Sequence, residues 1–176
     1  MALSILTTTL RFTLLLVCVV AFAGKASRRR PVRTLADSLA ETGLPPALRR
    51  PAAAALLVAE LVIAATMAAP ATARPGSALA FLFFGVLTVG VAVTVRKANG
   101  AKCACFGAAK HELSRIHIAR NFTLTLMALV VLTVPAANQA SDAERSVLAG
   151  MLALPVFLLV FFIADVASIV VPAQHE

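Results

Sequence analysis

Long uninterrupted runs of apolar residues alternate with shorter polar segments along this chain. Five such runs occur, at about residues 3–23, 52–69, 78–95, 118–135 and 147–171. Most are close to the roughly 20 residues that an α-helix needs to cross the hydrocarbon core of a bilayer. Because the apolar residues are contiguous and do not alternate with polar ones, they favour helices over the strands of a barrel. The pattern predicts an all-α fold, a polytopic transmembrane bundle of four to five helices forming one domain over residues 1–176.

The prolines and the first apolar run refine this prediction. Pro135 should end the fourth helix, whereas Pro155 should kink the fifth. The first run also has features of a cleaved signal peptide, because Arg11 precedes its most apolar part and Ala21-Phe22-Ala23 resembles a cleavage site. The residues before Arg11 are already apolar, however, unlike the charged start of a signal peptide. We therefore expect the first helix to be retained.

Composition supports a membrane protein over other classes. The chain is 60% apolar and 14% charged, whereas an average soluble domain is about 45–50% apolar and about 25% charged. A soluble domain of 176 residues has too little interior to bury this much apolar surface. These values argue against a soluble enzyme, a disordered tail and a disulfide-rich secreted module. The net charge of +8 indicates contact with the lipid bilayer and not with nucleic acid.

The basic residues are concentrated in two of the predicted loops. The loop 24–51 and the segment 96–120 together contain thirteen of the sixteen Lys and Arg residues. In a five-helix bundle these two regions lie on the same side of the membrane. The positive-inside rule then places both of them in the cytoplasm.

The strongest candidate chemistry lies in the loop 96–117. This loop contains the sequence Gly100-Ala101-Lys102-Cys103-Ala104-Cys105-Phe106-Gly107, with two of the three cysteines of the chain. A Cys-x-Cys pair can close a small, strained disulfide, and strained disulfides are readily reduced. Lys102 and Lys110 favour the reactive thiolate, and Gly107 adds backbone freedom. The loop therefore predicts an accessible, reactive dithiol with Cys103 and Cys105 as catalytic residues, the alternative being two inert thiols.

Metal binding is a second interpretation of the same loop. Cys103, Cys105, His111 and His117 provide two thiolates and two imidazoles, a ligand set that zinc accepts. The spacing between the cysteines is shorter than in common zinc sites, and the gap between the two pairs is also short. Zinc is therefore disfavoured, and we assign no metal ligands.

Three further groups lie within the apolar runs. Glu60, Asp165 and Cys18 are about 13, 9 and 8 Å from the basic face at 1.5 Å per residue. Ionisable residues in membrane spans usually face the bundle interior, which predicts a polar pocket beneath the Cys-x-Cys loop. We expect Arg120 to form an ion pair with Glu60 or Asp165, and Asn121 to add hydrogen bonds. The alternatives are a structural ion pair for the acids and plain packing for Cys18, which could otherwise be a resolving thiol.

Several short motifs occur in an order that is found in a known family. They are Ala23-Gly24-Lys25, Leu44-Pro45, Glu60-Leu61, Cys103-Ala104-Cys105-Phe106-Gly107 and Arg120-Asn121. The chain resembles in these motifs the MauE/DoxX-like family of redox-associated membrane proteins, and in particular its methylamine utilisation branch. The cysteine motif is the most specific of them, and the resemblance extends from about Phe12 to Val134.

The resemblance implies a multi-pass helical bundle in a bacterial plasma membrane that helps to form or exchange disulfides in a client protein. In the methylamine utilisation branch the client is the disulfide-rich small subunit of methylamine dehydrogenase, and a thioredoxin-like protein usually accompanies the membrane protein. The very basic first loop departs from the family pattern, so the client itself is not carried over. Maturation of an exported client favours an outer location for the dithiol, against the charge distribution, and both orientations stay open.

The resulting hypothesis is a membrane thiol–disulfide redox protein. Cys103 and Cys105 cycle between dithiol and disulfide, while Glu60 and Arg120 shape the polar pocket and Glu60 is a candidate catalytic residue that relays a proton. Electrons pass to a thioredoxin-like protein or to a quinone. Two alternatives come from other classes, a small transporter or channel component that uses the intramembrane acids, and a non-catalytic assembly factor that could bind zinc.

Overall fold

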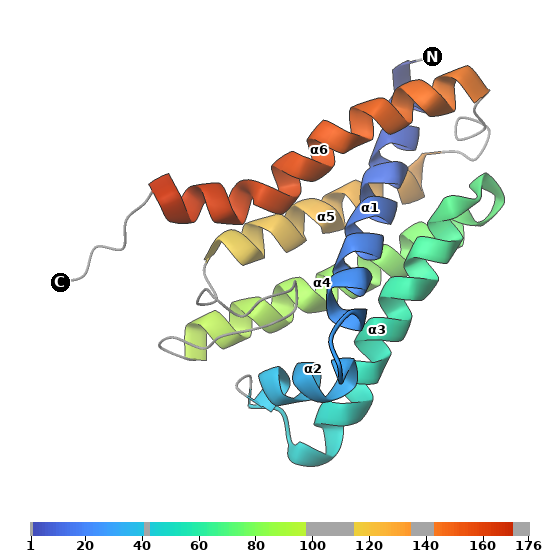
Figure 1. Cartoon of the computed structure of the whole chain (residues 1–176). Helices are drawn as coiled ribbons and strands as arrows, with labels where there is room; N and C mark the ends of the chain where they lie inside the picture. The colour runs from blue at the N-terminus through green and yellow to red at the C-terminus, as the bar shows by residue number, and fades with distance from the viewer. Residues whose placement is uncertain (1, 41–42, 98–114, 135–142, 171–176) are drawn as a thin grey trace.

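Five long helices make up most of the molecule (Figure 1). The computed structural model describes residues 2–40, 43–97, 115–134 and 143–170, with side chains described for residues 2–40, 43–96, 117–134 and 147–160. The long helices are α1 (Ala2–Ala26), α3 (Pro46–Ala68), α4 (Ala73–Lys97), α5 (Arg115–Thr133) and α6 (Ala143–Val170). A short helix, α2 (Pro31–Ala40), and a 3-10 turn, η1 (Pro70–Thr72), complete the described elements. No strand occurs in these segments, which confirms the predicted all-α fold.

Helix α1 is the central helix of the bundle. It contacts every other helix, most extensively α6 and α3, while α4 packs mainly against α5. Successive long helices from α3 to α6 alternate in direction, and the N-terminus of α1 lies at the same end as the start of α6 (Figure 1). The opposite end therefore carries α2, the end of α4 and the start of α5. The described parts of both basic segments lie at this end.

Helix α2 lies within a segment that reads as a basic loop in the sequence. Its apolar residues Val32, Leu35, Ala36 and Leu39 recur at helical spacing and pack against Ala53 and Leu57 of α3. With ten residues, α2 is too short to cross a membrane. The arginines around it in the sequence make its apolar face hard to recognise. The helix instead covers the first turns of α3.

The start of α3 precedes the predicted start near residue 52. Pro46 occupies the first helical position, where its fixed φ is already suitable for a helix. The Arg49 Nε atom donates a hydrogen bond of 2.8 Å to the Leu44 carbonyl oxygen just outside the helix. Pro51 lies inside the helix, close enough to its start that few intrahelical hydrogen bonds are affected. The arginine–proline sequence before residue 52 is thus part of α3.

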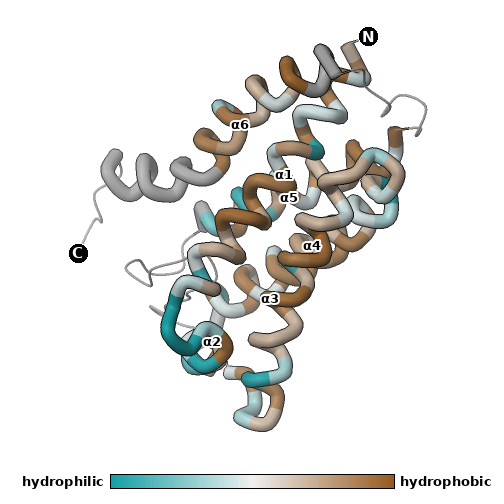
Figure 2. The backbone as a smooth tube through the Cα atoms, turned by 45° about the vertical axis from the view of Figure 1, so that its right-hand side comes forward, coloured by the Kyte–Doolittle hydropathy of each residue, from teal (hydrophilic) through white to brown (hydrophobic). Residues whose placement is uncertain are grey.

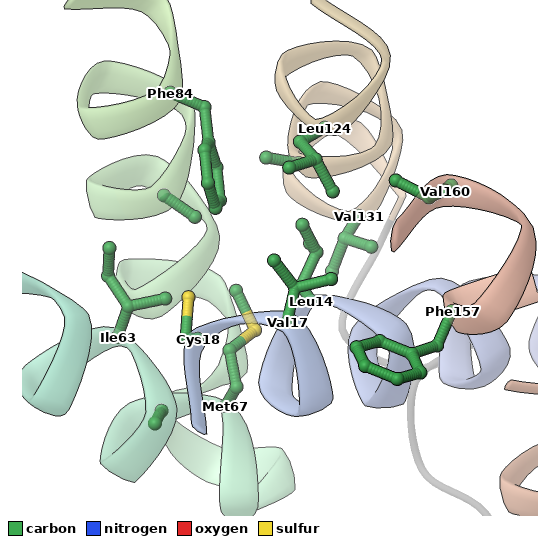
Figure 3. Close-up of a cluster of buried hydrophobic side chains, with 13 residues drawn as sticks. Leu14, Val17, Cys18, Ile63, Met67, Phe84, Leu124, Val131, Phe157 and Val160 are labelled. Carbon is green, nitrogen blue, oxygen red and sulfur yellow. The ribbon is translucent and has the colours of Figure 1, made fainter. Parts of the chain in front are cut away.

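The core lies between all five long helices (Figure 3). Leu14, Val17 and Cys18 of α1 meet Ile63 and Met67 of α3 and Phe84 of α4, and the cluster continues through α5 to Phe157 and Val160 of α6. Large apolar side chains also cover the outside, among them Val58 and Leu61 on α3 and Leu82, Val86 and Val89 on α4. Apolar residues on both the inner and outer faces are typical of helices in a membrane.

The distribution of hydropathy agrees with a membrane bundle. Hydrophobic residues predominate along the long helices, whereas hydrophilic residues gather around α2 (Figure 2). By length and composition, three described helical segments can cross a membrane, namely Ala2–Ala26, Pro46–Ala68 and Pro70–Arg96. Two shorter apolar segments are His117–Thr133 and Val147–Val160. The protein is therefore an all-α helical membrane bundle, as predicted.

Candidate functional site

A buried ion pair joins the central helix to α3. Lys25 Nζ, at the end of α1, donates a hydrogen bond to Glu60 Oε1 in α3. Lys25 is 5% exposed and Glu60 is 2% exposed, so neither charge is solvated. Opposite charges buried together avoid most of the penalty of an isolated charge in an apolar environment. The pair therefore fixes the end of α1 against the middle of α3.

The predicted pairing of Glu60 with Arg120 is wrong. Helix α1 extends to Ala26 and not only to residue 23, so Lys25 belongs to the helix and not to the basic loop. Cys18, Ala21 and Lys25 lie three to seven residues apart and are all buried, which places them on one face of α1. The ammonium group of Lys25 therefore lies inside the bundle. The predicted pairing of Arg120 with Asp165 involves a side chain outside the described part of α6.

The ion pair borders a narrow crevice between four helices. Lys25, Leu35, Leu56, Glu60, Phe83 and Leu87 line this crevice, which is too narrow to hold a water molecule. Glu60 Oε2 is buried and has no hydrogen-bond partner among the described residues. A buried carboxylate oxygen without a partner is costly, and it is free to accept a hydrogen bond from a ligand. Glu60 thus has one oxygen paired with Lys25 and one buried oxygen without a partner in the described part of the chain.

Arg120 and Asn121 lie on the buried side of α5, shortly after the helix begins. Asn121 Oδ1 is buried and lacks a hydrogen-bond partner within the described residues. Helix α5 packs against both α1 and α4, and Leu124, one turn further along, belongs to the core (Figure 3). Both polar residues therefore face the bundle interior, on the helix that follows segment 98–114.

Cys18 is the one cysteine whose side chain the structure describes, and it is a free thiol. It is 1% exposed and lies in the apolar core close to Ile63 and Met67 (Figure 3). An exchange reaction would require a second sulfur to enter this core. The surroundings favour a packing role, and a role as resolving thiol stays a prediction.

Several predicted site residues lie outside the described residues. They are Cys103, Cys105, Phe106 and Gly107, together with the side chain of Asp165. Two of the four zinc-ligand candidates are these cysteines, and a third, His111, is also outside. Where side chains are described, no group of three or more His, Cys, Asp or Glu residues could hold a metal ion. Lys25 is the buried charged residue that the sequence prediction missed, although it closes a quoted motif on the same helix face as Cys18.

One family model matches the part of the chain that contains most of these residues. The family model described as "Methylamine utilisation protein MauE" matches residues 3–134. The match begins in α1, includes Lys25, Glu60, the Cys-x-Cys segment and Asn121, and ends before α6. No curated protein and no solved structure matches the chain. The family match confirms the resemblance identified from the motifs.

Proposed function

The chain belongs to the methylamine utilisation protein MauE family, and we propose that it is a thiol–disulfide redox protein that assists maturation of a client protein. The reacting groups are Cys103 and Cys105. The protein is a multi-pass component of a bacterial plasma membrane, and its partners are the client and a thioredoxin-like protein.

One observation carries this proposal. The family match extends across the segment with both cysteines, and this segment connects α4 to α5, the helix that turns Arg120 and Asn121 into the bundle. The buried Lys25–Glu60 pair lies on α1 and α3, the helices packed beside them. Buried polar groups in a membrane protein usually mark functional sites. Their presence on helices of the same bundle supports chemistry and not merely membrane anchoring.

The proposed reaction is a balanced thiol–disulfide exchange. A client thiolate attacks one sulfur of the Cys103–Cys105 disulfide and forms a mixed disulfide. The second client thiolate then attacks the client sulfur of this intermediate, which forms the client disulfide and releases the reduced cysteine pair. Two electrons and two protons thereby move from the client to the protein. A disulfide of the thioredoxin-like partner reoxidises Cys103 and Cys105 by the same steps in reverse.

Thiol trapping in membranes tests this proposal. With Cys105→Ser, Cys103 should remain in a mixed disulfide with the client, because the resolving thiol is absent. The reciprocal Cys103→Ser variant identifies which cysteine attacks, and Cys18→Ala is the matched control because it removes the buried cysteine only. The double variant Cys103→Ser/Cys105→Ser should abolish every adduct. The proposal is overturned if this double variant leaves the adducts and the redox state of the client unchanged.

Glu60 Oε2 has no hydrogen-bond partner among the described residues, and this favours a second candidate function, a small transporter that uses intramembrane acids. In that case Glu60→Gln should abolish flux of the transported ion or solute. Substitution of Cys103 and Cys105 should then be silent. The two candidate functions therefore make opposite predictions for the same variants.

A further inference from the structure

A long apolar groove lies between α3 and α4. It has a volume of about 720 Å³ and is bounded by residues of α3 such as Ala55 and Ala59 and by residues of α4 from Leu79 to Thr94. This part of α4 is about 22 Å long at 1.5 Å per residue. Val86, which lines the groove, is 71% exposed, so the groove is open along its side to the surrounding hydrocarbon.

The groove arises because α3 and α4 separate towards the end of the bundle that carries α2. The two helices are joined by a short turn at the other end and diverge from it (Figure 1). Helix α4 also packs less extensively against α3 than against α5. Leu39 of α2 lines the groove together with Leu44, so the groove has a mouth at the α2 end.

Two arginines flank this mouth, one from each helix. Arg49 Nε donates a hydrogen bond of 2.8 Å to the carbonyl oxygen of Leu44, which holds the guanidinium group of Arg49 close to the groove. Arg96 is exposed and follows Thr94 by two residues on α4. In the described part of the chain neither arginine forms an ion pair. Both guanidinium groups can therefore bind an anion.

The charge around the mouth favours an anionic occupant. Among the described side chains Asp37 is the one exposed acidic residue. Seven arginines lie at the same end, namely Arg28, Arg29, Arg30, Arg33, Arg49, Arg50 and Arg96. The guanidinium group matches the oxygens of a phosphate particularly well, and basic clusters between membrane helices bind anionic lipid heads.

The dimensions of the groove distinguish a lipid tail from a second membrane helix. A helix 22 Å long and about 10 Å across has a volume of about 1700 Å³, more than twice that of the groove. An acyl chain that reaches the middle of the bilayer spans about 15 Å, half of the hydrocarbon core, and fits within the length of the groove. A free phosphate ion would leave the apolar part of the groove unused.

We propose that this groove binds one anionic phospholipid from the leaflet at the basic face of the protein. One acyl chain lies between α3 and α4, and the phosphate lies at the mouth flanked by Arg49 and Arg96. The lipid fills the space that the diverging helices leave between them. This site does not depend on the proposed thiol chemistry, and it makes the stability of the bundle depend on the composition of the membrane.

Native mass spectrometry of the purified full-length protein tests the selectivity. The protein is equilibrated with equal amounts of phosphatidylglycerol and phosphatidylcholine that have identical acyl chains, and the retained lipid is identified. One phosphatidylglycerol should be retained at least tenfold more often than phosphatidylcholine. Equal retention of the two lipids would overturn the proposal, because it is the behaviour of unspecific surrounding lipid.

Substitutions on α4 test the position of the acyl chain and of the phosphate. Gly90→Leu should reduce retention at least tenfold because Gly90 lines the groove. Gly85→Leu is its matched control, since Gly85 does not line the groove and a Cβ added at either glycine meets nothing within 4 Å. Arg96→Gln should reduce the preference for phosphatidylglycerol at least threefold, whereas Arg74→Gln, at the opposite end of α4, should leave it unchanged. Equal retention within either pair of variants would overturn the proposal.

Photo-crosslinking in membranes identifies the occupant directly. The photoreactive amino acid p-benzoylphenylalanine in place of Val86, an exposed residue of the groove, should produce adducts with the mass of one phospholipid. Phosphatidylglycerol should be enriched in these adducts relative to its share of the membrane. Adducts with another protein chain, or adducts that match the average lipid composition, would overturn the proposal.

Discussion

Replacing Lys25 with methionine should destabilise the bundle through the charge that it leaves behind. Methionine keeps most of the apolar stem of lysine but removes the ammonium group that donates to Glu60 Oε1. Glu60 is then a carboxylate that is 2% exposed and lacks its counter-charge. Removal of one partner of a buried ion pair costs about 3–5 kcal/mol. At about 1.4 kcal/mol per factor of ten, we expect the unfolding equilibrium to shift by roughly two to four powers of ten.

The double variant Lys25→Met/Glu60→Leu separates the charge effect from packing. Replacement of a buried ion pair by apolar residues of similar volume is often neutral or stabilising by roughly 1–4 kcal/mol. The double variant should therefore be more stable than Lys25→Met alone. Arg29→Met, an exposed substitution close to the same end of α1, should change the stability by less than about 0.5 kcal/mol.

Reversible denaturation in detergent micelles, followed by circular dichroism, measures these differences. The four proteins of the double-mutant cycle yield the coupling energy between Lys25 and Glu60. A cost below about 1 kcal/mol for Lys25→Met, comparable to that of a surface ion pair, would refute the burial argument. A double variant less stable than either single variant would refute it as well.

Three further predictions follow from particular contacts. Gly76→Ala should destabilise the protein by about 1–3 kcal/mol in the same denaturation assay, because the added Cβ would lie 2.6 Å from Thr66 Oγ1. The control Gly85→Ala should be neutral or stabilising, because a Cβ added at Gly85 meets no atom within 4 Å. Cys18→Ala should leave the lifetime of mixed disulfides unchanged in trapping experiments, because Cys18 is buried in the core; prolonged adducts would instead identify it as the resolving thiol. A membrane-impermeant maleimide should fail to label the Cys-x-Cys segment in intact cells if the positive-inside prediction holds, and labelling would place the segment outside.

The fold could be predicted from the sequence because its main signal is the length of apolar runs. Any helix that crosses a membrane needs such a run, so the five long helices are visible without knowledge of their contacts. Helix α2 does not need one, and its apolar positions at helical spacing are surrounded by arginines. It was therefore hidden within a segment that composition alone assigns to a loop.

The arrangement of the site was harder to predict for a different physical reason. Helices that are apolar on all sides carry little information about which face packs inward, so the sequence does not specify the neighbour of Glu60. The expected depths in the membrane favoured Arg120 as the partner of Glu60. A similar depth does not show that two residues are also close together in the plane of the membrane. Lys25 was overlooked because a lysine at the end of an apolar run normally lies at the headgroups.

The packing of α1 bears on whether the first apolar run is a removable signal or a structural helix. Cleavage after Ala23 would remove Leu14, Val17 and Cys18 from the core, and with them the helix that contacts every other helix. It would also leave Lys25 on a free chain end, without the helix that directs its ammonium group to Glu60. A signal peptide has no such contacts to lose, because the mature protein folds without it. We therefore expect peptides from α1 in protein purified from membranes, and a mature chain that starts at Gly24 would contradict the bundle described above.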